Sequence, residues 1–220
     1  TYPSAQLDIE AARTTSPASL ALSTVTMADR DSDGDDDTLA LPFAVTSNAF
    51  FEDLNIEVSA INSDGDVVDT MTTGIEAGGG VPAPGAIYWT PHTTDDYTLS
   101  LEMKDLLGDT VDSAVTSSQM VHNMQPLPNA TLNTNVTLTW LPIQFTGNGI
   151  DYWGLSDNAS TLPHADEPTA YLWDFGDGNT STLRSPLRGY RDEGAYIANL
   201  TVQDQGGAWS LVYPNLVLIA

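Results

Sequence analysis

The chain has 220 residues, which is enough for one large domain or for two domains of about 100 residues each. Thirty acidic residues against six basic ones give a net charge of -24, and this balance excludes the clustered Lys and Arg that nucleic-acid binding needs. The chain contains no cysteine, which excludes disulfides, thiolate metal ligands and cysteine nucleophiles.

The first 19 residues stand apart from the pattern that follows. Gln6, Leu7 and Ile9 belong to a short stretch in which apolar and polar residues alternate. Such a segment can form an edge strand, a loose arm, or a strand that completes the sheet of a neighbouring copy. We therefore treat residues 1–19 as an extension and name these three residues as candidates for polymerisation.

Short apolar runs with a period of two fill residues 20–122 and indicate antiparallel β-structure. Gly, Asp, Asn and Pro separate the runs. Seven strands in about 100 residues is the number found in an immunoglobulin-like sandwich. We expect these strands at residues 20–27, 38–46, 54–61, 67–71, 86–90, 97–103 and 110–117.

An acidic loop lies between the first two of these strands. Residues 29–37 contain six aspartates and one glycine. Alternating carboxylates with a glycine at the sixth position suit calcium, which takes six to eight oxygen ligands and needs a sharp turn. The candidate ligands are Asp29, Asp31, Asp33, Asp35 and Asp37. The alternative is a solvated acidic hairpin whose aspartates reflect adaptation to high salt, as in a salt-adapted archaeon.

A linker is expected at residues 123–128, where Pro126 and Pro128 interrupt the alternation because proline cannot donate a ladder hydrogen bond. The second module then covers residues 129–220. We expect its strands at residues 132–140, 143–146, 170–175, 195–203 and 209–219, with a long loop from Gly147 to Pro168.

The most specific motif in the chain is Tyr171-Leu172-Trp173-Asp174-Phe175-Gly176-Asp177-Gly178, followed by a later strand that starts near Tyr196. Both pieces resemble the PKD (polycystic-kidney-disease-type) domain, an immunoglobulin-like module. The physical pattern agrees, because Trp173 and Phe175 point to one face and Asp177-Gly178 makes a turn. Asp174 and Asp177 are therefore expected to be turn residues of the fold and not catalytic carboxylates.

The resemblance implies an extracellular location and a role as a spacer or interaction module, because PKD domains are mostly of this kind. It implies no catalytic reaction. The fold class expected for the whole chain is all-β, with two tandem immunoglobulin-like antiparallel β-sandwiches and an N-terminal extension strand. Where the family has a short loop, this chain has the longer segment from Gly147 to Pro168.

Five Asn-x-Ser/Thr sequons lie in the second module, which makes them candidate glycosylation sites. They are Asn129, Asn135, Asn158, Asn179 and Asn199. The alternative is that they are unmodified polar strand residues.

No catalytic motif is present, and His92, His122 and His164 are isolated in sequence, so we expect no enzyme activity. We expect a secreted structural or adhesive subunit of a surface filament, sheath or spike, whose partners are copies of itself and whose cofactor is calcium. No apolar run is long enough to span a membrane.

Two alternatives stay open. The first is a carbohydrate-binding accessory module of a secreted hydrolase, in which Tyr152 and Trp153 stack on the sugar rings of a polysaccharide. The second is a viral spike or decoration protein built from the same modules.

Overall fold

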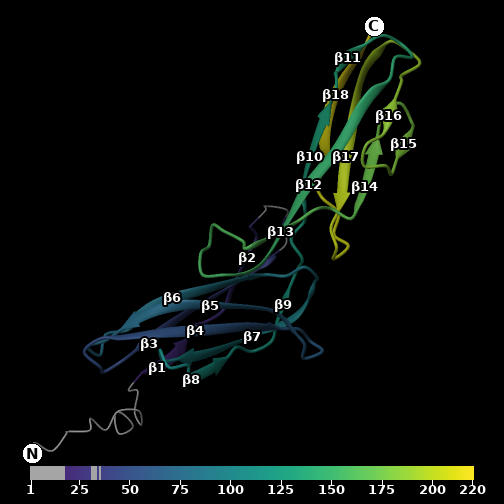
Figure 1. The fold of residues 1–220 in the computed structure, drawn as a ribbon. Helices are drawn as coiled ribbons and strands as arrows, with labels where there is room; N and C mark the ends of the chain where they lie inside the picture. The colour runs from purple at the N-terminus through teal and green to yellow at the C-terminus, as the bar shows by residue number, and fades with distance from the viewer. Residues whose placement is uncertain (1–17, 31–33, 35) are drawn as a thin grey trace, which may run out of the picture.

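The computed structural model of the chain describes residues 18–30, 34 and 36–220. In this part of the chain every regular element is a β-strand, and the strands form two sandwich modules (Figure 1). The all-β, immunoglobulin-like fold expected from the sequence is confirmed. The proposed polymerisation residues Gln6, Leu7 and Ile9 lie outside the described residues.

The first module packs two sheets face to face. One sheet begins with β1 (Ser19–Leu22), β3 (Thr38–Thr46) and β6 (Ala83–Thr90), with β2 (Thr26–Ala28) added on β3. The other has the order β5 (Val67–Ala77), β4 (Glu52–Ile61), β7 (Asp95–Lys104) and β8 (Thr110–Val115), with β9 (Gln119–Val121) added on β7. Alternate side chains of both sheets, such as Leu41, Trp89 and Leu101, fill the core between them.

The second module uses a sheet of its own and part of the first one. Its own sheet has the order β11 (Val136–Thr137), β18 (Tyr213–Ile219), β17 (Gly194–Gln203), β14 (Ala170–Asp174) and β15 (Thr180–Ser181). The facing layer is made by β10 (Leu127–Leu132), β12 (Ile143–Ser156) and β16 (Leu187–Arg188). Trp173 and Phe145 lie at the centre of this second core.

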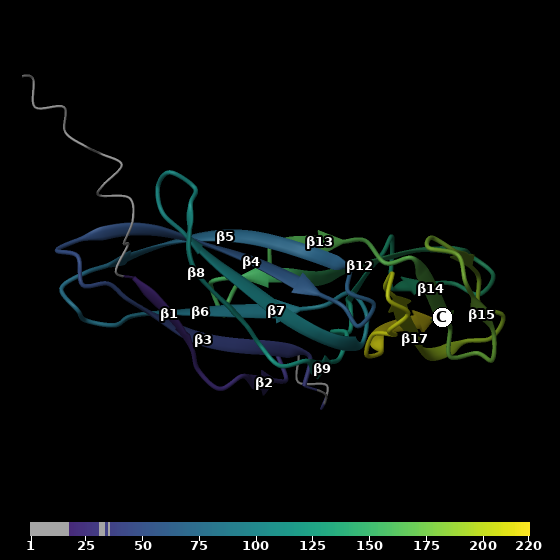
Figure 2. The same cartoon turned by 90° about the horizontal axis from the view of Figure 1, so that it is seen from below.

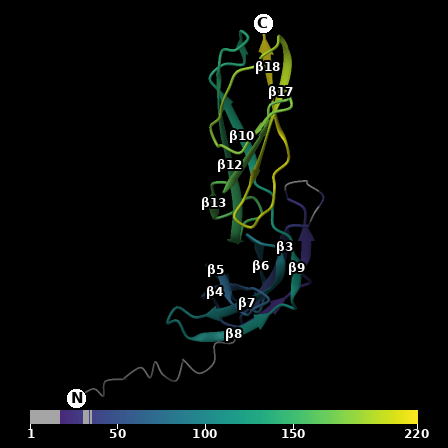
Figure 3. The same ribbon diagram turned by 90° about the vertical axis from the view of Figure 1, so that its right-hand side faces the viewer.

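Strand β12 is shared by the two modules. It pairs with β10 from Phe145 to Ile150, with β13 (His164–Asp166) from Asp151 to Trp153, and with β6 from Gly154 to Ser156. The expectation of a loop from Gly147 onward is therefore wrong, since the backbone stays extended as far as Ser156. Figures 1 and 3 show β12 running from the second module down to the first.

The far end of β12 becomes part of the first module. Leu155 is only 3% exposed and belongs to the core of the first module. Its backbone N–H donates to the carboxylate of Asp69 on β5 at 2.8 Å. The chain thus leaves the first module after β9, crosses into β10, and returns to the first module through β12. Figure 2 shows the two modules end to end with β12 and β13 at their meeting point.

Candidate functional site

The most unusual chemistry in the described residues lies at the joint between the modules. Strand β12 and the short strand β13 bring Asp151, Trp153, His164 and Asp166 to the loop that follows β6, where His92 lies. These residues are up to 74 positions apart in sequence. The fold, and not a local motif, assembles them.

A column of three rings forms the middle of the joint. The indole of Trp153 has the His92 ring on one face, with centroids 3.8 Å apart, and the His164 ring on the other, at 4.1 Å. The indole Nε1 donates to Asp166 Oδ2 at 2.9 Å. Both faces of the Trp153 ring are therefore covered. Of the two aromatic residues proposed to stack on a sugar, only Tyr152 remains a candidate.

Carboxylates surround the ring column. The two ring nitrogens of His92 lie 3.3 Å from Asp151 Oδ2 and 3.2 Å from Asp166 Oδ2. Asp204, which follows β17, accepts a hydrogen bond from the Asn123 amide at 2.8 Å. Asp151 and Asp204 are 1% and 2% exposed, so both carboxylates are shielded from water.

Burial changes the protonation of this cluster. Burial, together with the nearby charges of Asp204 and Asp166, raises the pKa of Asp151 from 3.8 to about 7. Burial also lowers the pKa of His92, although Asp166 and Asp204 oppose that shift. Within the described part of the chain, both oxygens of Asp151 lack a hydrogen-bond partner, so no hydrogen bond offsets the burial that favours the protonated carboxyl group.

Close backbone packing fixes the joint on its other side. Gly206, in the turn between β17 and β18, lies so near His92 that a Cβ atom there would be 1.7 Å from the His92 carbonyl oxygen. Only a residue without a side chain fits this approach. On the β5 side, Thr73 donates to Asp157 at 2.8 Å and His164 lies 3.8 Å from Asp69.

The joint does not have the arrangement of a catalytic or metal centre. Each ring nitrogen of His92 faces a carboxylate, so neither is directed at a hydroxyl that it could activate. Among the described residues, no group of three or more histidine and acidic side chains is placed to hold a metal ion. The arrangement suits a structural joint whose charge changes with pH.

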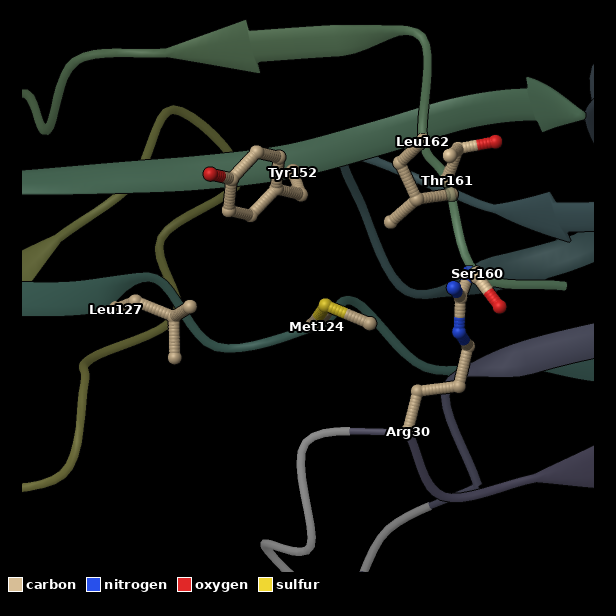
Figure 4. A pocket seen from close by; sticks show the side chains of 7 residues that line it. All are labelled: Arg30, Met124, Leu127, Tyr152, Ser160, Thr161 and Leu162. Atoms are coloured by element: carbon tan, nitrogen blue, oxygen red, sulfur yellow. The ribbon is translucent and has the colours of Figure 1, made fainter.

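A pocket of about 590 Å³ opens beside the joint (Figure 4). In this view Tyr152 of β12, Leu162 and Thr161 lie above the open space, and Met124 of the connecting segment and Arg30 lie below it. Residues from both modules and from the connection build this pocket. Its lining residues are Arg30, Met124, Leu127, Tyr152, Ser160, Thr161 and Leu162.

The predicted calcium loop is described only in part. Asp31, Asp33 and Asp35 lie outside the described residues. Asp29 accepts a hydrogen bond from the backbone of Gly34 at 3.0 Å, and the buried Asp37 accepts one from the Thr38 hydroxyl at 3.1 Å. Calcium binding by this loop stays a prediction.

The sequons differ in how their asparagines are presented. Four asparagine side chains are exposed, and Asn199 on β17 is partly buried. The Asn158 side chain accepts a hydrogen bond from the Ser160 backbone at 2.9 Å, and Asn179 contacts Asp177 at 3.2 Å. Their glycosylation stays a prediction. The exposed ones are Asn129, Asn135, Asn158 and Asn179.

The residues of the motif around Trp173 lie as expected. Asp174 and Asp177 accept hydrogen bonds from the backbone of Gly176 and Asn179, at 2.9 and 3.1 Å, and so hold the turn. Trp173 and Phe175 are buried in the second core. The Tyr196 hydroxyl donates to the carbonyl of Asp192 at 3.0 Å, which is the contact of a tyrosine corner.

A family model described as the PKD domain matches residues 154–211. The second module is a PKD domain. The matched residues include the Trp173 motif and the β17 strand, which also carried the resemblance in the sequence. The PKD domain is a non-catalytic module, so no reaction is assigned to this half of the chain.

Sequence relatives that share this PKD region are much longer proteins. A "Microbial collagenase" of Vibrio alginolyticus is 38% identical over 65 residues, which are 30% of this chain and 8% of the relative. "Collagenase ColQ1" of Bacillus cereus is 53% identical over 38 residues, or 17% of this chain and 4% of the relative. The chain thus matches less than a tenth of the length of these curated relatives.

Two solved structures are similar to parts of the chain. The PKD1 domain of the Vibrio cholerae metalloprotease PrtV is 25% identical, covers 44% of this chain and 98% of its own length, and gives a TM-score of 0.32. An amphioxus IgVJ-C2 molecule is 12% identical, covers 80% of this chain and 99% of its own, and gives a TM-score of 0.31.

Sequence reasoning did not find the joint. It treated His92 and His164 as isolated loop residues and did not single out Asp151, Asp166 or Asp204. The one available signal was the pair of aromatic residues in an otherwise polar segment, Tyr152 and Trp153. These indicated a site but not which residues would surround it.

Proposed function

We propose that this chain is a non-catalytic accessory region of a larger extracellular hydrolase, and that its two modules act as one rigid body. The observation that carries the proposal is the sharing of β12, which pairs with strands of both modules without a break. Curated proteins that share the PKD region are named collagenases and metalloproteases, which supports the link to a hydrolase.

A rigid accessory region holds its neighbours at a fixed distance and angle. Flexible domain linkers lack pairing and packing across the boundary, and relative motion is then the default. Here strand pairing, the buried Leu155 side chain and the Gly206 contact all cross the joint. Such a region suits an enzyme that must stand off from a large insoluble substrate.

Rigidity can be measured by spin labelling, because the chain has no cysteine of its own. Cysteines placed at the exposed Thr72 and Thr182 put one nitroxide on each module. We expect a single narrow distance distribution in double electron–electron resonance at pH 5, at which all distributions in this test are compared. Gly206→Ala should broaden it through the clash with His92, whereas Gly74→Ala, where no atom lies within 4 Å, should leave it narrow. A broad distribution in the unmutated chain contradicts the rigid-body proposal.

The hydrolase part of the proposal needs a separate test. An antibody against this chain is used to purify the natural polypeptide from the medium and from the cells of the source organism. We expect an extracellular polypeptide much larger than 23.5 kDa that degrades gelatin in a zymogram. A cell-bound polymer of a polypeptide near that mass, without activity, would instead favour the surface-subunit hypothesis.

The other functional hypotheses have less support. In the described residues no helix combines the length and apolar character needed to cross a membrane. The strand proposed for self-association lies outside the described residues. For the carbohydrate hypothesis, both faces of the Trp153 ring are covered, and half of the six side chains that line the pocket with Tyr152 are apolar.

A further inference from the structure

The pocket beside the joint has the size and composition of a ligand site. Its volume of about 590 Å³ lies within the range of roughly 300 to 1,000 Å³ that small-molecule sites occupy. It is assembled from segments of both modules and from the connection between them (Figure 4). The rigid joint therefore fixes its shape.

One end of the pocket is apolar. Met124, Leu127 and the Tyr152 ring present aliphatic and aromatic surface to the open space (Figure 4). Aliphatic walls of this kind favour a hydrocarbon group over a sugar, whose hydroxyls would lose their hydrogen bonds to water on entry. The apolar end therefore suits an aliphatic or aromatic group.

The other end is polar and carries a positive charge. Arg30 lines it beside the hydroxyl residues Ser160 and Thr161. One guanidinium nitrogen of Arg30, Nη2, donates to the carbonyl oxygen of Ala159, which anchors the side chain to the second module. The other, Nη1, is buried and has no hydrogen-bond partner among the residues that the structure describes.

A buried donor without a partner is costly, and the cost is greater for a charged group. In a chain with a net charge of -24, cationic groups are few. A carboxylate is the acceptor that satisfies a guanidinium nitrogen best, because both groups are charged. The charge of Arg30 therefore selects for an anionic head group.

We propose that this pocket binds an amphipathic carboxylate, with its apolar group against Met124 and Tyr152 and its carboxylate on Arg30. Two sources share this chemistry: a free small carboxylic acid, and the carboxy terminus of a peptide that ends in an apolar residue. The inference goes beyond the accessory role proposed above and does not depend on it.

The experiment uses the whole chain labelled with ¹³C-methyl methionine, because Met124 lines the pocket and the chain has only five methionines. The probes are N-acetyl-leucine, its uncharged analogue N-acetyl-leucinamide, and a hexapeptide that ends in leucine. We expect saturable shifts of the Met124 methyl signal, with at least tenfold weaker binding of the amide than of the acid.

Variants assign the selectivity to Arg30. Arg30→Gln should bind acid and amide equally, and Thr161→Val should weaken the acid without disturbing the fold. The matched control is Arg184→Gln, since Arg184 is an exposed arginine that pairs with Glu167 at 2.9 Å, away from the pocket lining. Equal binding of acid and amide by the unmutated chain, or displacement of the probes by a neutral polysaccharide, would overturn the proposal.

The peptide probe separates the two sources. Binding of the hexapeptide at least tenfold tighter than N-acetyl-leucine assigns the pocket to peptide carboxy termini, because contacts beyond the last residue then contribute. Equal affinities assign it to small carboxylic acids. A Met124 signal that shows no saturable shift with any probe refutes the site.

Discussion

The buried carboxylate of Asp151 makes the stability of the chain depend on pH. A pKa raised from 3.8 to about 7 means that the charged form costs about 4 kcal/mol in the folded state relative to the protonated form. Between pH 3.8 and about 7, the Asp151 carboxyl group keeps its proton in the folded state, whereas it has lost that proton in the unfolded chain. The cost is therefore absent below pH 3.8, grows as pH rises, and is complete above about pH 7.

Asp151→Asn removes this cost, because the amide has a similar shape and no charge. We expect the variant to be more stable than the unmutated chain at pH 8, by up to about 4 kcal/mol. At pH 5 the difference should be clearly smaller, because only part of the cost has developed at that pH. The assay is urea unfolding followed by tryptophan fluorescence at both pH values, with EDTA present so that only protons compete for the site.

The control is Asp64→Asn, which removes an exposed carboxylate in the turn between β4 and β5 and should show no pH-dependent difference. An Asp151→Asn variant that is less stable at pH 8, or that differs from the unmutated chain equally at both pH values, would refute the reasoning.

Three other changes test the fold and the predicted cation site. Leu155→Ala should lower the free energy of unfolding by about 2 to 5 kcal/mol and expose both modules to limited proteolysis, because this side chain from the second half lies in the first core; cleavage confined to the second module would contradict this. Tyr190→Phe should cost about 1 kcal/mol in urea unfolding, since its hydroxyl donates to the Phe175 carbonyl at 3.1 Å. The control Tyr213→Phe should have no effect, and equal losses would contradict the assignment. Calcium should raise the melting temperature of the unmutated chain, and less so that of Asp29→Asn; no rise in either would favour the salt-adapted hairpin.

The strands of both modules follow from local pattern, and the sequence located most of them. The strand expected at residues 38–46 coincides with β3, and the turn at Asn62 is held by its side chain, which accepts from the backbone of Asp66 at 2.8 Å. The strand expected at residues 132–140 was wrong beyond Leu132. There the chain forms the two-residue strand β11 and then a turn in which Trp140 has a φ of 67°.

The extension of β12 was missed because its composition is that of a loop. Gly147 and Gly149 indicate a turn to any local rule, yet both lie in a strand. Glycine is required at both positions because of close packing. A Cβ at Gly147 would be 2.9 Å from Tyr171, and one at Gly149 would be 2.8 Å from Pro168. A glycine required by a distant neighbour cannot be distinguished in sequence from one required by a turn.

The joint was hidden for a related reason. His92 comes from the first module, whereas Asp151, Asp166 and Asp204 come from three separate elements of the second. No spacing rule connects residues that meet only after two sandwiches have folded and docked. The acidic excess of the chain also concealed these three carboxylates among thirty acidic residues.

Two opposing energies of similar size meet at the joint. Opening it would expose Leu155, which costs about 2 kcal/mol, and would break the pairing of Gly154 and Ser156 with β6. Closing it above about pH 7 traps the charge of Asp151 at a cost of up to about 4 kcal/mol, which includes the repulsion from Asp166 and Asp204. On the outer side His164 lies 3.8 Å from Asp69.

The modules should therefore be locked at pH 5, where less than half of this cost has developed, and loosen as the pH rises to 9. Spin labels at Thr72 and Thr182 test this directly: the distance distribution should be narrow at pH 5 and broaden at pH 9. With Asp151→Asn it should stay narrow at both, because the trapped charge is gone. Equal broadening in the variant would show that another group loosens the joint, and the energy assigned to Asp151 would then be too large.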